Sequence, residues 1–494
     1  MAYYERLSAQ DASFLAYEDA DPTAHMHIGG VSIYEGGSLT NGRGGVDIER
    51  LRAYVASRLD LIPRYRQRLA TVPVLGQPVW VDDERFEVRY HVRHTRLPRP
   101  GDERELKRLA GRILSQRLDR NRPLWELWII EGLTDRRFAM LTKTHHCMMD
   151  GVSGVDVSSV LMRLAPDPTF VPAAAWTARP CPTGASLLAD ELARRGRLPW
   201  RAARGLAQAT RATWRGRGQL EQSLSATGAM LRLAWQGAAR TPINRPIGPH
   251  RRFDWTLVPL ADAKAIKNRL GGKLNDVVLA VVAGALGSFL RGRRVNVDIL
   301  DFIAAVPVSI RAEGDRTLGN HVAAWLAKLP IAERDARTRY EQVVALTTAL
   351  KRSGGADPTA RLYDLAELGG RPALTAVVEL TRRLSPCNLV VTNVPGPPFP
   401  LYMLDAKMLL ACPQVTLLCE QGLGIAIFSY LDHLHFGCNA DWDLVPDLHD
   451  LVTDVATAFD ELAAAAGIER APEATGGREP ARDDAAPPRR RVEG

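Results

Sequence analysis

The sequence predicts an α/β fold made of two halves that a basic connector joins. Residues 1–175 and 253–466 each alternate between strand-like and helix-like segments. The 494-residue chain is long enough for two domains of roughly 200 residues each. Between the two halves, residues 176–252 change in composition and carry mostly positive charge.

The first half contains three segments that matter for function. Residues 46–69 place Leu, Val and Tyr at helical spacing, which predicts a helix. Residues 136–147 alternate as a strand does, and we expect a helix over 151–164. One face of the strand carries Phe138, Met140, Thr142 and Thr144.

The connector is the most basic part of the chain. From Arg179 to Arg252 there are 14 arginines, no lysines and three acidic residues, in a chain of net charge +8. Its content of Ala, Leu and Trp predicts basic amphipathic helices. Three interpretations of the connector stay open: a solvated linker, a surface that rests on anionic lipid, or a nucleic-acid binder. No nucleic-acid-binding motif accompanies the charge, so we expect no nucleic acid as a partner.

The second half alternates in the same way. The expected elements are a buried helix over 275–290, strands over 299–311 and 388–394, a strand pair over 415–441 turning near 431–433, and an amphipathic closing helix over 447–465. The tail, 467–494, is rich in Pro, Ala and charge and lacks apolar periodicity, which predicts disorder.

Cysteine usage and hydropathy indicate a reduced, cytoplasmic protein. None of the six cysteines forms a CxxC pair, and the N-terminus lacks the pattern of a signal peptide. The longest apolar stretch, 277–290, has 14 residues, whereas a membrane-spanning helix needs roughly 20. Any membrane contact is therefore expected to be peripheral.

The candidate active site is the run His145-His146-Cys147-Met148-Met149-Asp150-Gly151, where a strand ends and a helix is expected to begin. A neutral imidazole can accept a proton from an alcohol near pH 7. Asp150 can fix the local turn, and Gly151 allows the backbone to turn tightly. His145 is either part of the site or a satisfied core histidine. The bare HxxxD spacing is weak, since His250 and Asp254 repeat it in the connector.

Other histidines do not predict a metal site. None of the closely spaced pairs has the cluster of acids or cysteines that a zinc site needs, so we expect no metal. The pairs are His25 with His27, His91 with His94, and His433 with His435.

Several further motifs carry a family resemblance that covers roughly residues 5–465. They are Leu7-Ser8 with Asp11–Phe14, Pro123-Leu124-Trp125, Asn275-Asp276, Val306–Ser309 leading to Arg311, Leu318–Asn320, and Thr392–Pro397 before Pro400–Tyr402. With the HHxxxDG run, they make the chain resemble the bacterial wax ester synthase/diacylglycerol acyltransferase family, within the superfamily of chloramphenicol acetyltransferases and peptide-synthetase condensation domains. Cys147 and Met148 fill variable positions of that run, and the tail has no counterpart.

The resemblance implies two chloramphenicol acetyltransferase-like subdomains with mixed sheets, a long helical connector and an active-site tunnel between them. It implies long-chain acyl-CoA as a substrate rather than a cofactor, with diacylglycerol or a fatty alcohol as acceptor. It also implies peripheral association with an anionic membrane, the inner face of the plasma membrane, or lipid droplets. The residues that bind coenzyme A are not predicted.

In the expected mechanism, His146 is the general base for direct acyl transfer. Asp150 orients the loop. Cys147 is the neighbour of His146 on the strand and is expected to face the opposite side, which argues against a covalent route through its thiol. Asn275 and Asp276 are the expected contribution of the second half. Asn275 either donates to the oxyanion or caps a helix. The run from Pro395 to Pro398 is expected to form a rigid turn, which either lines the tunnel or makes no contact with substrate.

Three classes of function follow from these residues. The first is triacylglycerol synthesis, and wax ester synthesis differs from it only in the acceptor. The second is a carrier-dependent condensation-type acyltransferase, since such domains share HHxxxDG. The third is a non-catalytic protein of the lipid surface.

Overall fold

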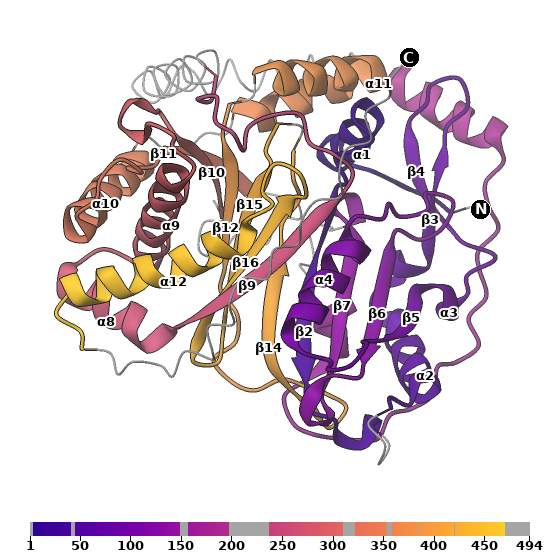
Figure 1. The fold of residues 1–494 in the computed structure, drawn as a ribbon. Helices are drawn as coiled ribbons and strands as arrows, with labels where there is room; N and C mark the ends of the chain where they lie inside the picture. The colour runs from indigo at the N-terminus through magenta and orange to yellow at the C-terminus, as the bar shows by residue number, and fades with distance from the viewer. Residues whose placement is uncertain are drawn as a thin grey trace, which may run out of the picture.

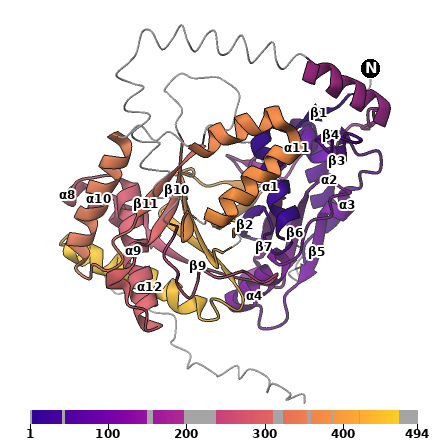
Figure 2. The ribbon, with the colours of Figure 1, turned by 90° about the horizontal axis from the view of Figure 1, so that it is seen from above.

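The structure, a computed structural model, describes residues 3–40, 45–148, 157–196, 237–309, 322–352, 358–384, 386–418 and 420–469. The expected disorder of the tail, most of the connector and the motif residues Asp150 and Gly151 lie outside these ranges. Figure 1 shows two sheet-centred halves side by side, and Figure 2 shows the same arrangement from above.

The first half is built on a seven-stranded mixed sheet with the strand order β5-β6-β7-β2-β14-β13-β8. The strands are β2 (His27–Tyr34), β5 (Val92–Arg96), β6 (Trp125–Glu131), β7 (Phe138–His145), β8 (Met162–Arg163), β13 (Tyr402–Met403) and β14 (Ala406–Gln414). Only β5 and β6 pair in parallel. A small sheet of β1 (Glu5–Arg6), β4 (Pro78–Asp82) and β3 (Gln67–Thr71) lies beside it. The helices are α1 (Ala9–Ala20), α2 (Ile48–Arg58), α3 (Val88–His91), α4 (Glu103–Leu114) and α5 (Val157–Leu161).

The second half is built on a six-stranded mixed sheet with the order β11-β10-β12-β15-β16-β9. The strands are β9 (Arg251–Pro259), β10 (Ile303–Ser309), β11 (Val322–Lys328), β12 (Leu389–Val394), β15 (Leu423–Tyr430) and β16 (His433–Asp441). The helices are α8 (Leu260–Leu270), α9 (Leu274–Gly292), α10 (Ala336–Arg352), α11 (Pro358–Leu384) and α12 (Leu448–Ala465). The predicted buried helix, strand pair and closing helix are confirmed as α9, β15–β16 and α12.

Strand β14 of the second half of the sequence belongs to the sheet of the first half. It pairs antiparallel with β2 of that sheet. Figure 1 shows it, in orange, beside the indigo and purple strands. The predicted division at residue 253 is therefore wrong for residues 402–414, which complete the first sheet. Hydropathy could not predict this, because it does not encode which distant strand a given strand pairs with.

Three predicted elements of the first half are shorter than expected. The helix over 46–69 ends at Arg58, because Pro63 disfavours helical geometry at Ile62 and removes a donor. Two 3-10 turns follow, and β3 begins at Gln67. The strand over 136–147 ends at His145, and residues His146–Met148 form a 3-10 turn. Of the helix over 151–164, the structure describes only Val157–Leu161, before the short strand β8.

Helix α9 is the centre of the second core. In the described part of the chain it is the one helix long and apolar enough to cross a membrane, and most of it is buried. It packs against α8, α10 and α12. Its apolar residues therefore face protein, as in the core helix of a globular domain.

The start of the connector lies on the small sheet of the first half. Residues 184–196 are helical, and the buried Leu187 packs against Val72, Val79 and Val81. Arg179 donates to Asp82 through Nε at 2.9 Å and a terminal nitrogen at 2.7 Å. This arginine is thus engaged within the protein rather than with an external anion.

Candidate active site

His146 lies in the turn that follows β7. Its backbone N–H donates to the carbonyl of Met26 at 2.8 Å, just before β2 begins. His145, the preceding residue, pairs across the sheet with His27. The turn is therefore anchored to the neighbouring strand, which fixes where the His146 side chain leaves the backbone.

The imidazole of His146 stacks on the ring of Phe14 in α1, with 3.9 Å between ring centroids and 22° between planes. The side chain is half-buried. Burial lowers the pKa of His146 to about 4, and the neighbouring His145 acts in the same direction. The ring is consequently neutral at pH 7, which is the form that can accept a proton.

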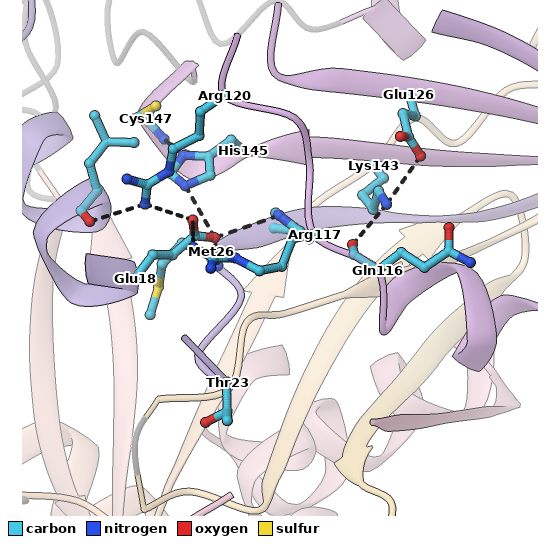
Figure 3. Close-up of polar contacts among 12 residues, drawn as sticks. Glu18, Thr23, Met26, Gln116, Arg117, Arg120, Glu126, Lys143, His145 and Cys147 are labelled. Atoms are coloured by element: carbon cyan, nitrogen blue, oxygen red, sulfur yellow. Dashed lines mark hydrogen bonds and ion pairs between the residues drawn. The ribbon is translucent and has the colours of Figure 1, made fainter. Parts of the chain in front are cut away.

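The buried carboxylate of Glu18 joins a network of polar contacts beneath this turn, in which Arg117 and Arg120 stay partly exposed (Figure 3). One carboxylate oxygen accepts the N–H of Met26 at 2.9 Å and lies 3.4 Å from Nε2 of His145. The other accepts from Arg120 at 2.8 Å and Arg117 at 3.3 Å. Burial acts to raise the pKa of Glu18, but its contacts with His145 and Arg120 outweigh burial and hold it well below its usual range.

His145 has a supporting role in this arrangement. Its side chain is buried, and Nδ1 accepts the N–H of Cys147 at 3.1 Å. That contact assigns the proton to Nε2, the nitrogen that faces Glu18. Glu18 thus holds the turn from two sides, through Met26 and through His145. The contacts show His145 as a buried residue of the turn, and a part for it in catalysis stays a prediction.

Cys147 is a core residue. Its side chain is buried within the apolar cluster of the first half. Burial raises the pKa of the Cys147 thiol well above its ordinary value, so the nucleophilic thiolate is disfavoured. The expected reason was alternation along a strand, whereas the residue lies in the 3-10 turn.

Asp276 caps helix α9. Its carboxylate accepts the N–H of Lys273 at 2.7 Å and the hydroxyl of Thr347 at 2.7 Å. The N-cap position belongs to Lys273. The capping contact considered for Asn275 is therefore made by Asp276, and a part for Asp276 in catalysis stays a prediction.

Asn275 makes a different contact. Its side-chain oxygen accepts from the amide nitrogen of Asn393 at 3.2 Å, near the end of β12. An amide whose oxygen is occupied in this way keeps its N–H donors for another group. The two asparagines connect the first turn of α9 with the Thr392–Pro397 run of the family resemblance.

The proline-rich run after β12 packs on the neighbouring strand pair. The N–H of Gly396 donates to the hydroxyl of Ser429 at 2.9 Å, and Pro397 accepts from Leu431 at 3.2 Å. A β-carbon at Gly396 would lie 2.1 Å from the carbonyl oxygen of Ser429. Close packing therefore requires glycine at this position.

One of the histidine pairs, His91 with His94, makes contacts typical of structural residues. Nδ1 of His91 is bonded to the carbonyl of Trp125 at 2.8 Å, and His94 lies 3.2 Å from Glu131. Within the described ranges, no group of three or more His, Cys, Asp or Glu could hold a metal ion.

Phe14 and Glu18 are the supporting residues whose roles sequence reasoning missed. They lie four residues apart and so share one face of α1. The usable signal was Glu18 itself, an acidic residue on the apolar side of a helix, where a charge needs a partner.

Comparisons with known proteins agree with this geometry. The wax ester synthase/diacylglycerol acyltransferase catalytic domain matches residues 7–278, and the C-terminal domain of the same enzymes matches residues 318–463. A Mycobacterium tuberculosis protein named probable diacylglycerol O-acyltransferase is 33% identical over 466 residues, covering 93% of this chain and 96% of its own length.

Solved structures give the same picture. The wax ester synthase/diacylglycerol acyltransferase from Marinobacter aquaeolei VT8 superposes with a TM-score of 0.68 at 25% identity, covering 94% of this chain and all of its own. The starter condensation domain of rhizomide synthetase, solved with C8-CoA and Leu-SNAC, shares the fold with a TM-score of 0.56 at 13% identity and covers 94% of both chains. The predicted two-part fold with mixed sheets is confirmed. The chain belongs to the wax ester synthase/diacylglycerol acyltransferase family.

Proposed function

We propose that this acyltransferase makes triacylglycerol from diacylglycerol and long-chain acyl-CoA, with His146 as its general base. The observation that carries the proposal is the neutral, half-buried imidazole of His146, held by Met26 and Phe14 at the end of β7. The name of the mycobacterial relative supports diacylglycerol as the acceptor.

The proposed reaction is a direct transfer. His146 takes the proton of the acceptor hydroxyl as its oxygen attacks the thioester carbonyl of acyl-CoA. The tetrahedral oxyanion collapses, the carbon–sulfur bond breaks, and the coenzyme A thiolate recovers the proton from the imidazolium. A positioned base contributes typically about 10²–10⁴-fold to such a rate. The buried thiol of Cys147 fits this route, because no acyl-enzyme is needed.

Asn275 is the proposed donor to the oxyanion. We expect Asn275→Ala to lower kcat, because losing one such donor costs roughly 2.7–4 kcal/mol of transition-state stabilisation. Asp276→Ala should instead lower the melting temperature, because it removes the cap of α9. Measuring kcat and melting temperature for both variants separates the roles. A normal kcat in Asn275→Ala would contradict the donor role.

Wax ester synthesis is the second candidate, favoured by the match to the Marinobacter enzyme. It uses the same site with a long-chain fatty alcohol as acceptor. A carrier-dependent condensation reaction has weaker support, since the condensation domains share only the fold.

The proposed location is cytoplasmic, with peripheral contact at an anionic membrane or a lipid droplet. The support is the basic connector, because arginine and tryptophan side chains suit an anionic lipid surface. Vesicle co-sedimentation at low and high salt would measure this contact, which should weaken as salt increases.

The decisive experiment measures thiol release from palmitoyl-CoA by the purified protein, with diacylglycerol or hexadecanol as acceptor. Lipid products are separated, and a folded His146→Ala variant is run alongside. A neutral-lipid product that the variant does not make supports the proposal, and the preferred acceptor decides between the two candidates. No product with either alcohol from a folded protein would overturn it.

A further inference from the structure

The stacked pair of Phe14 and His146 has a geometry that goes beyond ordinary core packing. The two rings are nearly parallel and their centroids are only 3.9 Å apart. Phe14 packs against two apolar clusters, one in the first half and one that includes Val378 of α11. Its ring is therefore held by apolar contacts with both clusters, and it stacks on one face of the imidazole.

We propose that Phe14 is a positioning residue that fixes the plane of the His146 ring and stabilises the imidazolium formed during proton transfer. This inference rests on the proposed function, because it assigns a role to Phe14 in that reaction. Phe14 does not touch the substrate in this proposal and acts only through His146.

Burial determines which charge state of His146 needs support from its surroundings. Burial favours the neutral ring of His146, so the cation formed when it takes a proton needs stabilisation inside the protein. The face of an aromatic ring carries partial negative charge and attracts a cation within about 6 Å. Phe14 lies well inside that distance.

Among the residues that the structure describes, the nearby charged groups leave stabilisation of the cation to the Phe14 ring. His145, on β7, directs Nδ1 to the N–H of Cys147 and Nε2 to Glu18, and it offers no negative charge to His146. Glu18, on α1, directs its carboxylate to Met26, His145 and the arginines. Within the described residues, His146 forms no ion pair with a carboxylate.

The test replaces Phe14 with a series of fluorinated phenylalanines, which keep nearly the same shape while the ring face loses negative charge. We expect kcat to fall with each added fluorine and the KM values for palmitoyl-CoA and the acceptor to stay constant. Phe14→Leu should lower kcat roughly 2- to 30-fold, the range of a cation–π contact. A kcat that does not respond to fluorination would overturn the electrostatic role.

The chain offers a matched control. Phe86 stacks on the buried His91 at 5.2 Å and 14°, outside the motif. Phe86→Leu should leave kcat unchanged. An equal loss of kcat in both variants would mean that any lost stack damages the enzyme, and the inference would fail.

An NMR titration of His146 gives a readout independent of turnover. The pKa of His146 should be lower in Phe14→Leu than in the unsubstituted protein, because the cation loses its aromatic partner. An unchanged pKa would overturn the inference. If the unsubstituted protein has no turnover with either alcohol, the proposed function fails, and this titration still decides the role of Phe14.

Discussion

At the scale of single residues, His146 combines partial burial with a fixed backbone. Its pKa of about 4 keeps the ring proton-free well below neutral pH. For the proposed role of His146 as a base, the low pKa has the disadvantage of weaker basicity, since the protonated form must exist briefly during transfer. Stacking on Phe14 and the bond to Met26 offset that disadvantage through orientation.

The pH dependence of activity follows from this depressed pKa. An ordinary histidine would lose half of its proton-free form near pH 6.5. Because the pKa of His146 is about 4, we expect kcat/KM to stay level from pH 8 to about 5.5 and fall only as pH approaches 4. Initial rates across this range measure it. Half-loss of activity near pH 6.5 would contradict the assigned environment.

Protein stability needs its own measurement over the same pH range. The neutral ring contributes stability above the unfolded pKa of about 6.5, and that stability is lost as pH falls toward 4, because the unfolded chain takes up the proton first. His25, with a pKa lowered to about 4 chiefly by burial, acts in the same direction. Melting temperatures recorded at each pH separate unfolding from loss of the base.

Glu18 should matter to both stability and catalysis. Glu18→Gln removes the charge that Arg120 and His145 face, and breaking a buried ion pair costs on the order of 3–5 kcal/mol. We expect a lower melting temperature, and a lower kcat among molecules that stay folded, because Met26 and His146 lose their anchor.

The matched control for that variant is Glu49→Gln. Glu49 forms ion pairs with Arg52 and Arg89, but its side chain is 56% exposed. Exposed pairs contribute roughly 0–1 kcal/mol, so this variant should behave like the unsubstituted enzyme. Equal behaviour of the two variants would show that Glu18 is no anchor.

At this scale, sequence reasoning predicted the position of His146 at the end of a strand but not the residues that support it. The placement of His146 after a strand follows from local spacing, and the structure has it there. The contacts of Glu18 join residues 8 to 127 positions away, which no local pattern encodes. The capping role moved from Asn275 to Asp276 because α9 begins one residue earlier than predicted.

At the scale of elements, β2 depends on two adjacent glycines. A β-carbon at Gly29 would lie 1.9 Å from the carbonyl oxygen of Thr142 in β7. One at Gly30 would lie 2.4 Å from that of Cys412 in β14. Neither carbonyl can move without disturbing the sheet. Because both positions are glycine, β2 can lie close to β7 on one side and to β14 on the other.

Gly30→Ala should therefore destabilise the protein. Overpacking against backbone typically costs about 1–3 kcal/mol, and denaturant unfolding measures it. Gly292→Ala is the control, because nothing lies within 4 Å of a β-carbon there and alanine favours helix. Similar losses from both substitutions would contradict the role of close packing.

Elements with strong local signals were predicted well, and those fixed by distant partners were not. The apolar run of α9 and the turn between β15 and β16 are visible in the sequence. The placement of β14 depends on pairing with β2, more than 370 residues earlier. Periodicity shows that a segment is a strand but not which sheet it enters.

At the scale of the whole molecule, the second half supports the site of the first. Strand β14 covers one edge of β2, and α11 packs against α1, the helix that carries Phe14 and Glu18. Figure 2 shows α11 beside α1. The two halves of the sequence are thus not independent folding units.

A fragment of residues 1–252 should consequently fail to fold. Without β14, the edge of β2 and the buried side chains of Val31 and Ile33 would be exposed, which favours aggregation. Solubility and circular dichroism of the fragment measure this. A soluble, cooperatively unfolding fragment would show that the first half folds without β14.

Strand β14 also determines when the first sheet can be completed during synthesis of the chain. A ribosome releases β2 and β7 long before residues 406–414, and at about 5–20 residues per second the delay is on the order of ten seconds to a minute. During that time the histidine motif exists in a nascent chain whose sheet still lacks a member. His146 therefore reaches the geometry described above only after residues 406–414 have been synthesised, and a chaperone that shields the open edge of β2 would act within this interval.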